Sequence, residues 1–393
     1  MRVLVAPMMA MAESAGPSGR ARVLAGAMAA KGWQAALCVP EGASADALAG
    51  VQAIPVRVPV PMGLPRAIGR RMFPLAQRLG LNRRVPMACF DDVLRLTGNV
   101  DGRYLEAAVR QLREVIHRER FDAVYSEFNI AAIIAAMAEK VPVFGTTSYP
   151  TQPSFASNPA AVAGVNRVLR SLSMGPVRSP EDVLLMPRVR FVPSCRAMEP
   201  FAEDAKVVFT GPFAGMPPEP SSAADMPEAS RNVVVAYLGN GTVTPRRAVA
   251  VLAEALQGSG LELHVAGLPE GFAEGVRTAP HPDFAELLPR AVAFVNHGGQ
   301  NSVMDGIAFG APQLICPGRV FERRFNAEAA ARNGVGVVLE HEHFDAEKVR
   351  KAIGRLVDGQ EAFQKAACVL RSEFAGLGGT DTVLNTMESV LAG

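Results

Sequence analysis

Short apolar runs alternate with helix-like stretches along nearly the whole chain. The first run, "RVLVA" (2–6), precedes a small-residue loop, "MAESAGPSG" (11–19), and then a helical stretch that closes at Gly32. Further strand-like runs follow at "QAALCV" (34–39), "DAVYSE" (122–127), "VPVFGT" (141–146), "VRFVPS" (189–194) and "KVVFTGP" (206–212). This alternation predicts βαβ units, and therefore a parallel sheet with helices on both faces.

The pattern stops at residues 214–231, "AGMPPEPSSAADMPEASR", which are rich in Pro, Ala and Ser and have no periodicity. We interpret this segment as a linker between domains. The alternation then restarts with "NVVVAYLGNGT" (232–242), "LELHVAG" (261–267), "AVAFVNHGG" (291–299), "PQLICP" (312–317) and "VGVVLE" (335–340). We therefore predict two α/β domains, 1–213 and 232–393, with a last helix that can return to the first domain.

Composition narrows the class of protein. Hydrophobic residues make up 49% of the chain and charged residues 20%, as in a globular protein. Forty basic and thirty-eight acidic side chains leave a net charge of +2, which gives no case for a nucleic-acid binder. Five scattered cysteines without metal-like spacing indicate reduced thiols. With no leader sequence and no apolar run near ~18 residues, we expect a soluble cytoplasmic protein.

The segment 59–90 differs from the rest of the chain. It carries six arginines and no acidic residue before Asp91, and apolar residues are interleaved with the arginines. One interpretation is a solvated loop and helix whose apolar residues turn inward. The other is a basic, apolar rim that receives an acceptor or makes peripheral contact with the inner face of an anionic membrane.

The stretch "FVNHGGQNSVMDGIAFGAPQL" (294–314) is the main candidate for chemistry. A strand ending in His297 and two glycines, followed by a helix, is a geometry that holds an anion, because the first N–H groups of the helix are unpaired. Asn301 and Ser302 would add donors, and Asp305 lies on the same helix face as Asn301. An acid there suits sugar hydroxyls, so the stretch suggests a ribose-plus-diphosphate ligand. Singly, each residue could instead be a structural His or a helix cap.

Together these residues resemble the donor-binding motif of the family 1 glycosyltransferases, which have the GT-B fold. That motif runs roughly His-x-Gly-x-Asn/Gly-Ser/Thr, an acid eight residues after the His, Gly-x-Pro, an Asp-Gln pair and an Asn. The matching residues are His297, Gly299, Asn301, Ser302, Asp305, "GAP" at 310–312 and Asn326. The similarity extends to "ELLPRAVAFVNHGG" (286–299) and to "AYLGNGT" (236–242), which takes the place of a phosphate loop.

The resemblance implies two Rossmann-like domains facing each other across a cleft, with a nucleotide sugar on the C-terminal domain and the acceptor on the other. The residues implied to hold the diphosphate are His297, Gly298, Gly299, Asn301, Ser302, Asn240, Gly241 and Thr242. Asp305 would take the ribose, and the backbone near Phe284 would read the base. The family usually has Glu at the ribose position. Asp keeps the charge with a shorter reach, which favours a UDP-sugar and leaves TDP as the alternative.

Two positions depart from the family pattern. The Asp-Gln pair that grips the sugar falls on Glu322 and Arg323, where an arginine could pair with a uronic acid or reinforce the diphosphate. The His that deprotonates the acceptor in inverting members falls on Pro17. We expect Glu127, in "VYSEF", to serve as the base directly, with Glu13 as a second candidate.

Two alternatives stay open for these residues. Glu127 could simply cap the helix that begins near Asn129. Ser14, Ser18 and Arg20, around Gly16 and Gly19, could form an anion-binding turn.

The first hypothesis is thus an inverting glycosyltransferase that moves a sugar from a nucleotide diphosphate to a small-molecule or lipid-like acceptor, without metal or other cofactor. A second is a catalytically silent partner or activator of the same fold. A third is a sugar-nucleotide epimerase. The sequence does not give the sugar, the acceptor or the oligomeric state.

Overall fold

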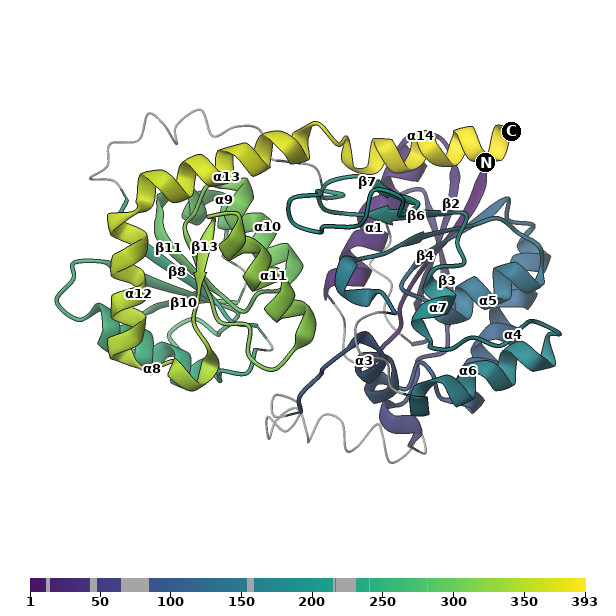
Figure 1. Cartoon of the computed structure of the whole chain (residues 1–393), viewed down its shortest axis with the longest axis horizontal. Helices are drawn as coiled ribbons and strands as arrows, with labels where there is room; N and C mark the ends of the chain where they lie inside the picture. The colour runs from purple at the N-terminus through teal and green to yellow at the C-terminus, as the bar shows by residue number, and fades with distance from the viewer. Residues whose placement is uncertain are drawn as a thin grey trace. The chain divides into compact units, whose positions relative to one another are not determined.

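The structure is a computed structural model, and it describes residues 1–11, 15–42, 48–64, 85–153, 159–214, 216, 231–239, 241–280 and 282–393. The chain divides into two compact units (Figure 1). Unit 1 comprises Met1–Leu79, Met87–Gly215 and Leu377–Gly393, and unit 2 comprises Gly80–Pro86 and Met216–Gly376. Each unit is described separately below.

Unit 1 is built on a parallel sheet of seven strands in the order β3-β2-β1-β4-β5-β6-β7. The strands are β1 (Arg2–Pro7), β2 (Gln34–Pro40), β3 (Val51–Val56), β4 (Ala123–Glu127), β5 (Val143–Thr146), β6 (Val189–Val192) and β7 (Val207–Phe209). Its α-helices are α1 (Ala15–Ala30), α3 (Phe90–Thr97), α4 (Gly102–Glu119), α5 (Ile130–Ala138), α6 (Pro159–Ser171), α7 (Glu181–Leu184) and α14 (Gly379–Ala392). Short 3-10 turns lie at Pro61–Gly63 and Tyr149–Thr151.

The last helix, α14, belongs to unit 1 (Figure 1). Its buried residues Val383, Leu384 and Met387 share one hydrophobic core with α1 and with alternate residues of β1, β2 and β4. The Lys31 Nζ atom, just after α1, binds Glu388 Oε2 at 2.8 Å on the rim of that core. Because strand residues alternate between faces, one face of the sheet is buried under α1 and α14.

Unit 2 repeats the plan with six parallel strands in the order β10-β9-β8-β11-β12-β13. The strands are β8 (Val233–Tyr237), β9 (Glu262–Ala266), β10 (Arg277–Ala279), β11 (Ala291–Asn296), β12 (Gln313–Ile315) and β13 (Gly336–Val338). The α-helices are α8 (Pro245–Leu256), α9 (Phe284–Leu287), α10 (Gln300–Ala308), α11 (Phe321–Arg332), α12 (Ala346–Asp358) and α13 (Gln360–Ala375), with 3-10 turns at Leu288–Arg290 and His341–His343.

The predicted fold class, two α/β units each with a parallel sheet, is confirmed. All the strand-like runs named from the sequence contain strands, while β3 and β10 were missed. Both lie at sheet edges, and β3 carries Pro55, which weakens a strand pattern. The expected loop at 11–19 was wrong in part, because α1 already begins at Ala15. Pro17 fits there, since a proline in the first turn of a helix gives up an N–H that would have no partner.

In each sheet the strand order reverses direction at one point. In unit 1 the reversal lies between β1 and β4, and in unit 2 it lies between β8 and β11. In open α/β sheets, ligands bind at the carboxyl ends of the strands at such a point. The two candidate groups of site residues should therefore be sought after β1 and β4, and after β8 and β11.

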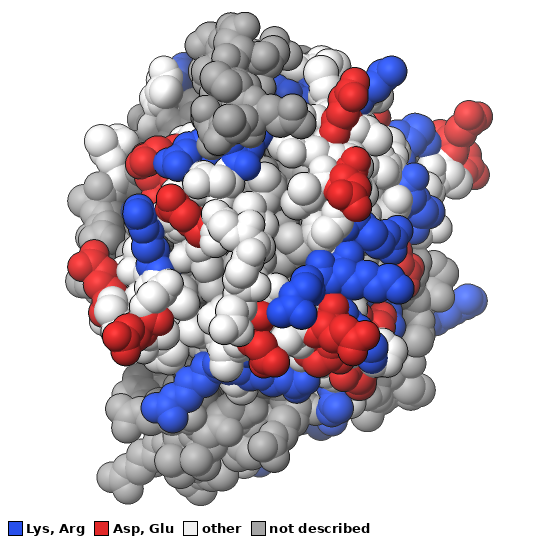
Figure 2. All heavy atoms as spheres, turned by 90° about the vertical axis from the view of Figure 1, so that its left-hand side faces the viewer, with Lys and Arg blue, Asp and Glu red and all other residues white. Residues whose placement is uncertain are grey.

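The charge distribution on the face drawn in Figure 2 does not indicate a particular class of binding partner. On the face drawn in Figure 2, acidic and basic side chains are interspersed. Within the described part of the chain, no helix is both long and apolar enough to cross a bilayer. The linker 214–231 and the basic segment 59–90 lie largely outside the described residues, so their predicted roles stay predictions.

Candidate functional site

The corner between β11 and α10 depends on its two glycines. Gly298 has φ of 77°, the left-handed region that favours glycine. A Cβ atom on Gly298 would lie 2.6 Å from the Arg323 carbonyl oxygen, so only glycine fits between β11 and the start of α11. Gly299 is the N-cap of α10, so the N-cap position has no side chain that could bond to the first N–H groups of the helix. The predicted strand–glycine–helix geometry is present.

Two buried amides fix the corner from behind, and sequence reasoning missed both. Asn296 and Gln313 are each 0% exposed. The Asn296 amide donates to Gln313 Oε1 at 3.0 Å, and its Oδ1 accepts the Gly298 N–H at 2.9 Å. Gln313 in turn donates to the carbonyl oxygen of Val303 in α10 at 3.2 Å. The sequence did contain a signal for this pair. A polar residue within an apolar, buried run, as in "AVAFVN" and "PQLI", indicates a side chain that needs a hydrogen-bond partner.

The start of α11 supports the same corner from the other side. Asn326, the motif's last residue, is buried and donates to the Gly298 carbonyl oxygen at 3.0 Å. Glu322 and Arg323 lie in the first turn of α11 and are half-buried. The Arg323 charge also reaches His297, because it contributes to lowering the pKa of the imidazole. The structure thus places the unusual Glu322–Arg323 pair beside the corner.

His297 lies between the corner and the loop after β8. Its ring meets the Tyr237 ring edge-on at 5.6 Å, and its Nδ1 lies 3.4 Å from the Tyr237 carbonyl oxygen. A Cβ atom on Gly241 would lie 3.3 Å from the His297 Cβ, and one on Gly239 would lie 3.4 Å from its Cε1, so this loop packs directly on the His297 side chain. Burial, with help from Arg323, lowers the pKa of His297 to about 4. The imidazole is therefore neutral at pH 7 in the free protein.

The phosphate loop predicted at 240–242 is only partly described. Asn240 lies outside the described residues, whereas Gly241 is in the loop that contacts His297. The Thr242 hydroxyl accepts the Arg319 N–H at 3.2 Å. A Cβ atom on Gly318 would collide with the same hydroxyl, at 2.0 Å. The loops after β8 and β12 thus meet at Thr242, and its predicted phosphate contact stays a prediction.

The remaining donor residues line up along α10 and α9. Asn301 is exposed in the first turn of α10 and Ser302 is buried. Asp305 is half-buried one turn later, and burial raises the pKa of its carboxyl to about 6. Phe284 begins α9 and packs against Tyr237, with ring centroids 6.0 Å apart, and against Phe294 at 5.8 Å. Unit 2 therefore gathers the predicted donor residues that are described at the carboxyl ends of β8, β11 and β12.

In unit 1, Glu127 ends β4 next to β1, and it is 0% exposed. Arg20 of α1 donates from Nε to Glu127 Oε1 at 2.7 Å, and its Nη2 lies 2.6 Å from the same oxygen. The Thr146 hydroxyl donates to Glu127 Oε2. Burial raises the pKa of the Glu127 carboxyl, while the charge of Arg20 and the bond from Thr146 act to lower it. Arg20 is thus the partner of the predicted base, and its sequence position gave no sign of this.

The other acceptor-side predictions have different outcomes. Glu13 and Ser14 lie outside the described residues. The proposed anion-binding turn around Gly16 and Gly19 is wrong in its geometry, since both glycines lie inside α1. The helix N-cap next to Glu127 is filled by Asn129, whose side chain accepts the Ala132 N–H at 3.1 Å. Glu127 therefore does not cap α5.

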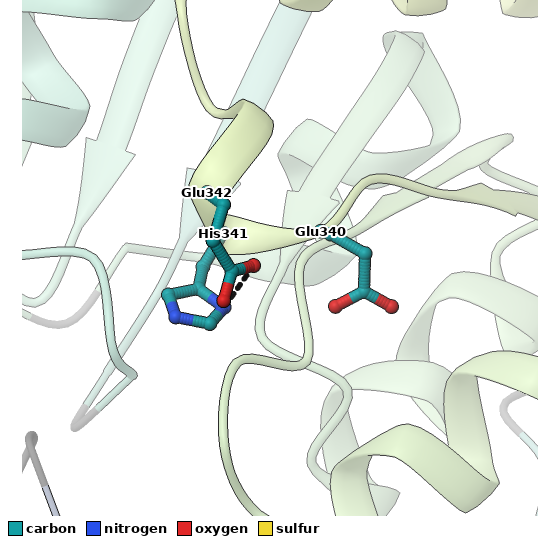
Figure 3. Close-up of side chains that lie close together, drawn as sticks. All are labelled: Glu340, His341 and Glu342. Carbon is teal, nitrogen blue, oxygen red and sulfur yellow. Dashed lines mark ion pairs between the residues drawn. The ribbon is translucent and has the colours of Figure 1, made fainter.

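A separate cluster lies after β13. Ligand-type atoms of Glu340, His341 and Glu342 lie within 4.8 Å of one another (Figure 3). Arg324 pairs with Glu340 at 3.1 Å, and the Arg319 Nε atom lies 3.2 Å from His341 Nε2. Two guanidinium groups at these atoms disfavour a divalent cation, because they repel it and occupy its ligands.

Comparison with known proteins agrees with this geometry. Residues 261–388 match the family described as erythromycin biosynthesis protein CIII-like, C-terminal domain. The L-demethylnoviosyl transferase of Streptomyces niveus is 38% identical over 79 residues, which cover 20% of each chain. The elloramycin glycosyltransferase ElmGT of Streptomyces olivaceus is 28% identical over 269 residues, 65% of each chain. The matches thus span a fifth to just under two thirds of these relatives.

Solved structures match over the full length. The calicheamicin glycosyltransferase CalG4 superposes with a TM-score of 0.73 at 17% identity, covering 100% of this chain and 98% of that one. The spinosyn rhamnosyltransferase SpnG gives 0.67 in its complexes with spinosyn aglycone, at 19% identity, and with thymidine diphosphate, at 18%. Each SpnG match covers 99% of this chain and 100% of that one. The chain therefore has the GT-B fold of these glycosyltransferases, and its residues 261–388 are similar to the C-terminal domain described as erythromycin biosynthesis protein CIII-like.

Proposed function

We propose that this protein is a glycosyltransferase that moves a sugar from a nucleoside diphosphate donor to a small-molecule acceptor. The observation that carries the proposal is the corner of unit 2, where His297, two glycines and the uncapped start of α10 meet the loop after β8. Such a corner holds a diphosphate through helix N–H groups and one imidazole. The glycosyltransferase relatives and the shared fold support the same activity.

The donor would lie across unit 2 from its base to its sugar. Phe284 and its backbone would receive the base, Asp305 the ribose hydroxyls, and His297 with Asn301 and Ser302 the diphosphate. Glu322 and Arg323 would face the sugar, where an arginine favours a donor with an anionic group or reinforces the diphosphate. UDP is the first expectation because Asp305 suits a ribose with two hydroxyls. TDP is the second, since SpnG is described in complex with thymidine diphosphate.

The acceptor side would be unit 1, and the transfer would invert the anomeric carbon. The protein contributes by positioning two substrates and by stabilising the leaving diphosphate. We propose no resident metal or other cofactor, because helix N–H groups and His297 can balance the diphosphate charge. A cytoplasmic location, with peripheral membrane contact through 59–90 for a lipid-like acceptor, belongs to the same proposal.

A catalytically silent partner of the same fold is the second candidate. Pro17 at the position of the family's usual His favours it, and the diphosphate corner at His297 disfavours it. The silent partner would bind a nucleotide without turning over a donor. A sugar-nucleotide epimerase would instead release a free or altered sugar in the absence of acceptor.

A thermal-shift screen with UDP, TDP and GDP, followed by a donor-turnover assay, tests these candidates. A ligand at a hundred times its Kd stabilises the fold by about 2.7 kcal/mol, which is a measurable shift. Stabilisation by UDP or TDP together with transfer to an added aglycone supports the glycosyltransferase. Binding without turnover favours the silent partner, and no stabilisation by any of the three removes the basis of the donor site.

A further inference from the structure

The inference concerns Arg20 and Glu127 and rests on the proposed function. Both residues lie at the strand-order reversal of unit 1. Glu127 pairs with Pro7 at the carboxyl ends of β4 and β1, and α1, which carries Arg20, packs on both strands (Figure 1). This is the position at which an open α/β sheet binds its ligand. In unit 2 the equivalent position holds the predicted diphosphate corner.

The backbone beside this pair is strained. Phe128, which follows Glu127, has φ of 58°, a left-handed conformation that costs a bulky residue about 1–2 kcal/mol. Strain of this kind persists only where the surroundings impose it, and it concentrates at functional sites. Phe128 also places its ring 6.0 Å from the Arg20 guanidinium carbon. The position of the pair is therefore set by more than the ion pair itself.

The Arg20 and Glu127 side chains differ in their exposure to solvent. The Glu127 side chain is 0% exposed, whereas the Arg20 side chain is 13% exposed. Arg20 covers one carboxylate oxygen with two nitrogens, and Thr146 covers the other from β5. Behind Thr146 lies the Tyr125 hydroxyl, 2.8 Å away, with its pKa raised well above the usual value by burial. A molecule that arrives from solvent meets the guanidinium before the carboxylate.

Because the acceptor meets Arg20 before Glu127, the properties of the guanidinium determine how the acceptor can be activated. A guanidinium stays protonated at any accessible pH, so it can donate a hydrogen bond but cannot take a proton from an acceptor. A carboxylate that already accepts bonds from an arginine and a hydroxyl is a weaker base than one held in an apolar site. Among the described residues, the side of this site that faces solvent presents a guanidinium and not a base, which suits a nucleophile that needs no base.

We propose that the acceptor reacts as an oxyanion, a phenolate, enolate or carboxylate, held by Arg20, and that Glu127 positions Arg20. The acceptor releases its proton to water before it reacts. Its oxygen then forms a bond to the anomeric carbon, and the bond from that carbon to the diphosphate oxygen breaks. The electron pair leaves on the diphosphate, and no proton moves in that step. Among the described residues of unit 1, the charged groups at this position include Arg20 and, behind it, Glu127.

The pH dependence of transfer tests this assignment. Phenols of graded acidity, an aromatic acid and an aliphatic alcohol would be offered with a donor, and kcat/KM measured from pH 5 to 9. We expect the rate to rise with pH through the pKa of each acceptor, so that the midpoint moves when the acceptor is changed. We also expect the alcohol to be a poor acceptor. If the midpoint of the pH profile were the same for all acceptors, the titrating group would be a base of the enzyme, with Glu127 as the first candidate. That result would overturn the proposal.

Variants separate the two residues. Arg20→Met should lower kcat/KM for the phenols by about 10- to 100-fold, the range for a lost bond to a charged group, and Arg20→Lys should recover part of the loss. Glu127→Gln keeps an acceptor oxygen for Arg20, so we expect a loss of less than about tenfold, mostly in the KM of the acceptor. A base would lose at least ~100-fold in kcat. Arg118→Met removes an exposed arginine of α4 and serves as the control.

Failure of the Arg20 assignment can be distinguished from failure of the proposed function. If the phenols are glycosylated but Arg20→Met matches wild type while melting at the same temperature, the Arg20 assignment is wrong and the proposed function stands. If wild type binds UDP or TDP and transfers sugar to none of the acceptors, the glycosyltransferase proposal fails, and the inference fails with it.

Discussion

The His297 imidazole lies directly over Gly299, since a Cβ atom on residue 299 would come within 2.7 Å of Nε2. Nδ1 is turned the other way, 3.4 Å from the Tyr237 carbonyl oxygen. Nε2 is therefore the ring nitrogen next to the uncapped N–H groups of α10. A phosphate oxygen at that helix start would meet both, which ties the imidazole and the helix into one anion site.

A methyl group at residue 299 should break this arrangement. Gly299→Ala should weaken nucleoside diphosphate binding at least about tenfold, because the 2.7 Å overlap forces His297 out of its position. Gly354→Ala in α12 is the matched control. It meets nothing within 4 Å and should raise helix stability by up to ~1 kcal/mol without changing binding. Titration calorimetry with UDP and TDP measures the effect, and equal affinities for both variants would contradict the geometry.

His297 should take up a proton when the diphosphate binds. In the free protein its pKa is about 4, and a neutral ring whose N–H faces Tyr237 presents Nε2 as an acceptor, not a donor. A diphosphate beside Nε2 raises the pKa, because the anion favours the charged ring. We expect a binding enthalpy at pH 6 to 7 that varies with the ionisation enthalpy of the buffer, in the direction of proton uptake.

His297→Ala should abolish that variation and weaken binding by about 1.5–3 kcal/mol, the range for a bond to a charged group. The melting temperature of the free protein should change little, because the hydrogen bond that the imidazole makes to a described residue is long, 3.4 Å to the Tyr237 carbonyl oxygen. A buffer-independent enthalpy in wild type would show that His297 does not contact the diphosphate.

Residues of the donor site could be predicted from the sequence, whereas the buried residues that hold them in place could not. His297 and Asp305 were found because they lie close together in the sequence around one strand–helix corner, whereas Asn326 was identified only through the resemblance to the family motif. Asn296 and Gln313 were missed because their pairing depends on β11 and β12 being neighbours, which short-range patterns do not show. The pairing of Arg20 with Glu127 spans 107 residues and was missed for the same reason.

Those buried amides should carry much of the stability of unit 2. Asn296→Ala leaves Gln313 Oε1 and the Gly298 N–H without their partner, and each unpaired buried group costs about 1–3 kcal/mol. We therefore expect the free energy of unfolding of unit 2 to fall by about 2–5 kcal/mol in urea titrations. The control is Asn333→Ala, which removes a partly buried side-chain hydrogen bond to the Ala329 carbonyl oxygen at the end of α11. A loss no larger than that of the control would refute this role.

The fold could be predicted where burial is strongest. Runs such as "RVLVA" and "AVAFVN" are buried on both faces of a parallel sheet, so they read as continuous apolar segments. The edge strand β3, with three exposed residues, has no such pattern. The start of α1 was predicted five residues late, at Arg20 and not at Ala15, because Gly16, Pro17 and Gly19 suggest a loop. Packing on β1, β2 and β4 overrides their low helix propensity.

Asp305 should make donor binding depend on pH in one direction. Its pKa is raised to about 6 by burial, so the carboxylate that would accept two ribose hydroxyls is lost as the pH falls through 6. Proton uptake by His297 strengthens the binding of UDP and 2′-deoxy-UDP alike as the pH falls, so the Asp305 effect is the difference between them. From pH 7 to pH 5 we expect the affinity for UDP to fall relative to that for 2′-deoxy-UDP, because one more hydroxyl depends on the carboxylate charge. Asp305→Asn should bind more weakly at pH 7 and lose this part of the pH dependence.

The titration of Asp305 does not itself destabilise the fold at low pH, so it cannot weaken binding there through unfolding. A carboxyl whose pKa is raised in the folded state holds more protons there than in the unfolded chain between its ordinary value of about 3.8 and 6. Its contribution to stability therefore grows as the pH falls, and it opposes folding above pH 6. A larger loss of affinity at pH 5 for UDP than for its 2′-deoxy analogue, together with a folded state that Asp305 itself favours there, would locate the effect in the ribose contact. Equal pH profiles for UDP and its 2′-deoxy analogue would instead show that Asp305 does not touch the 2′-hydroxyl.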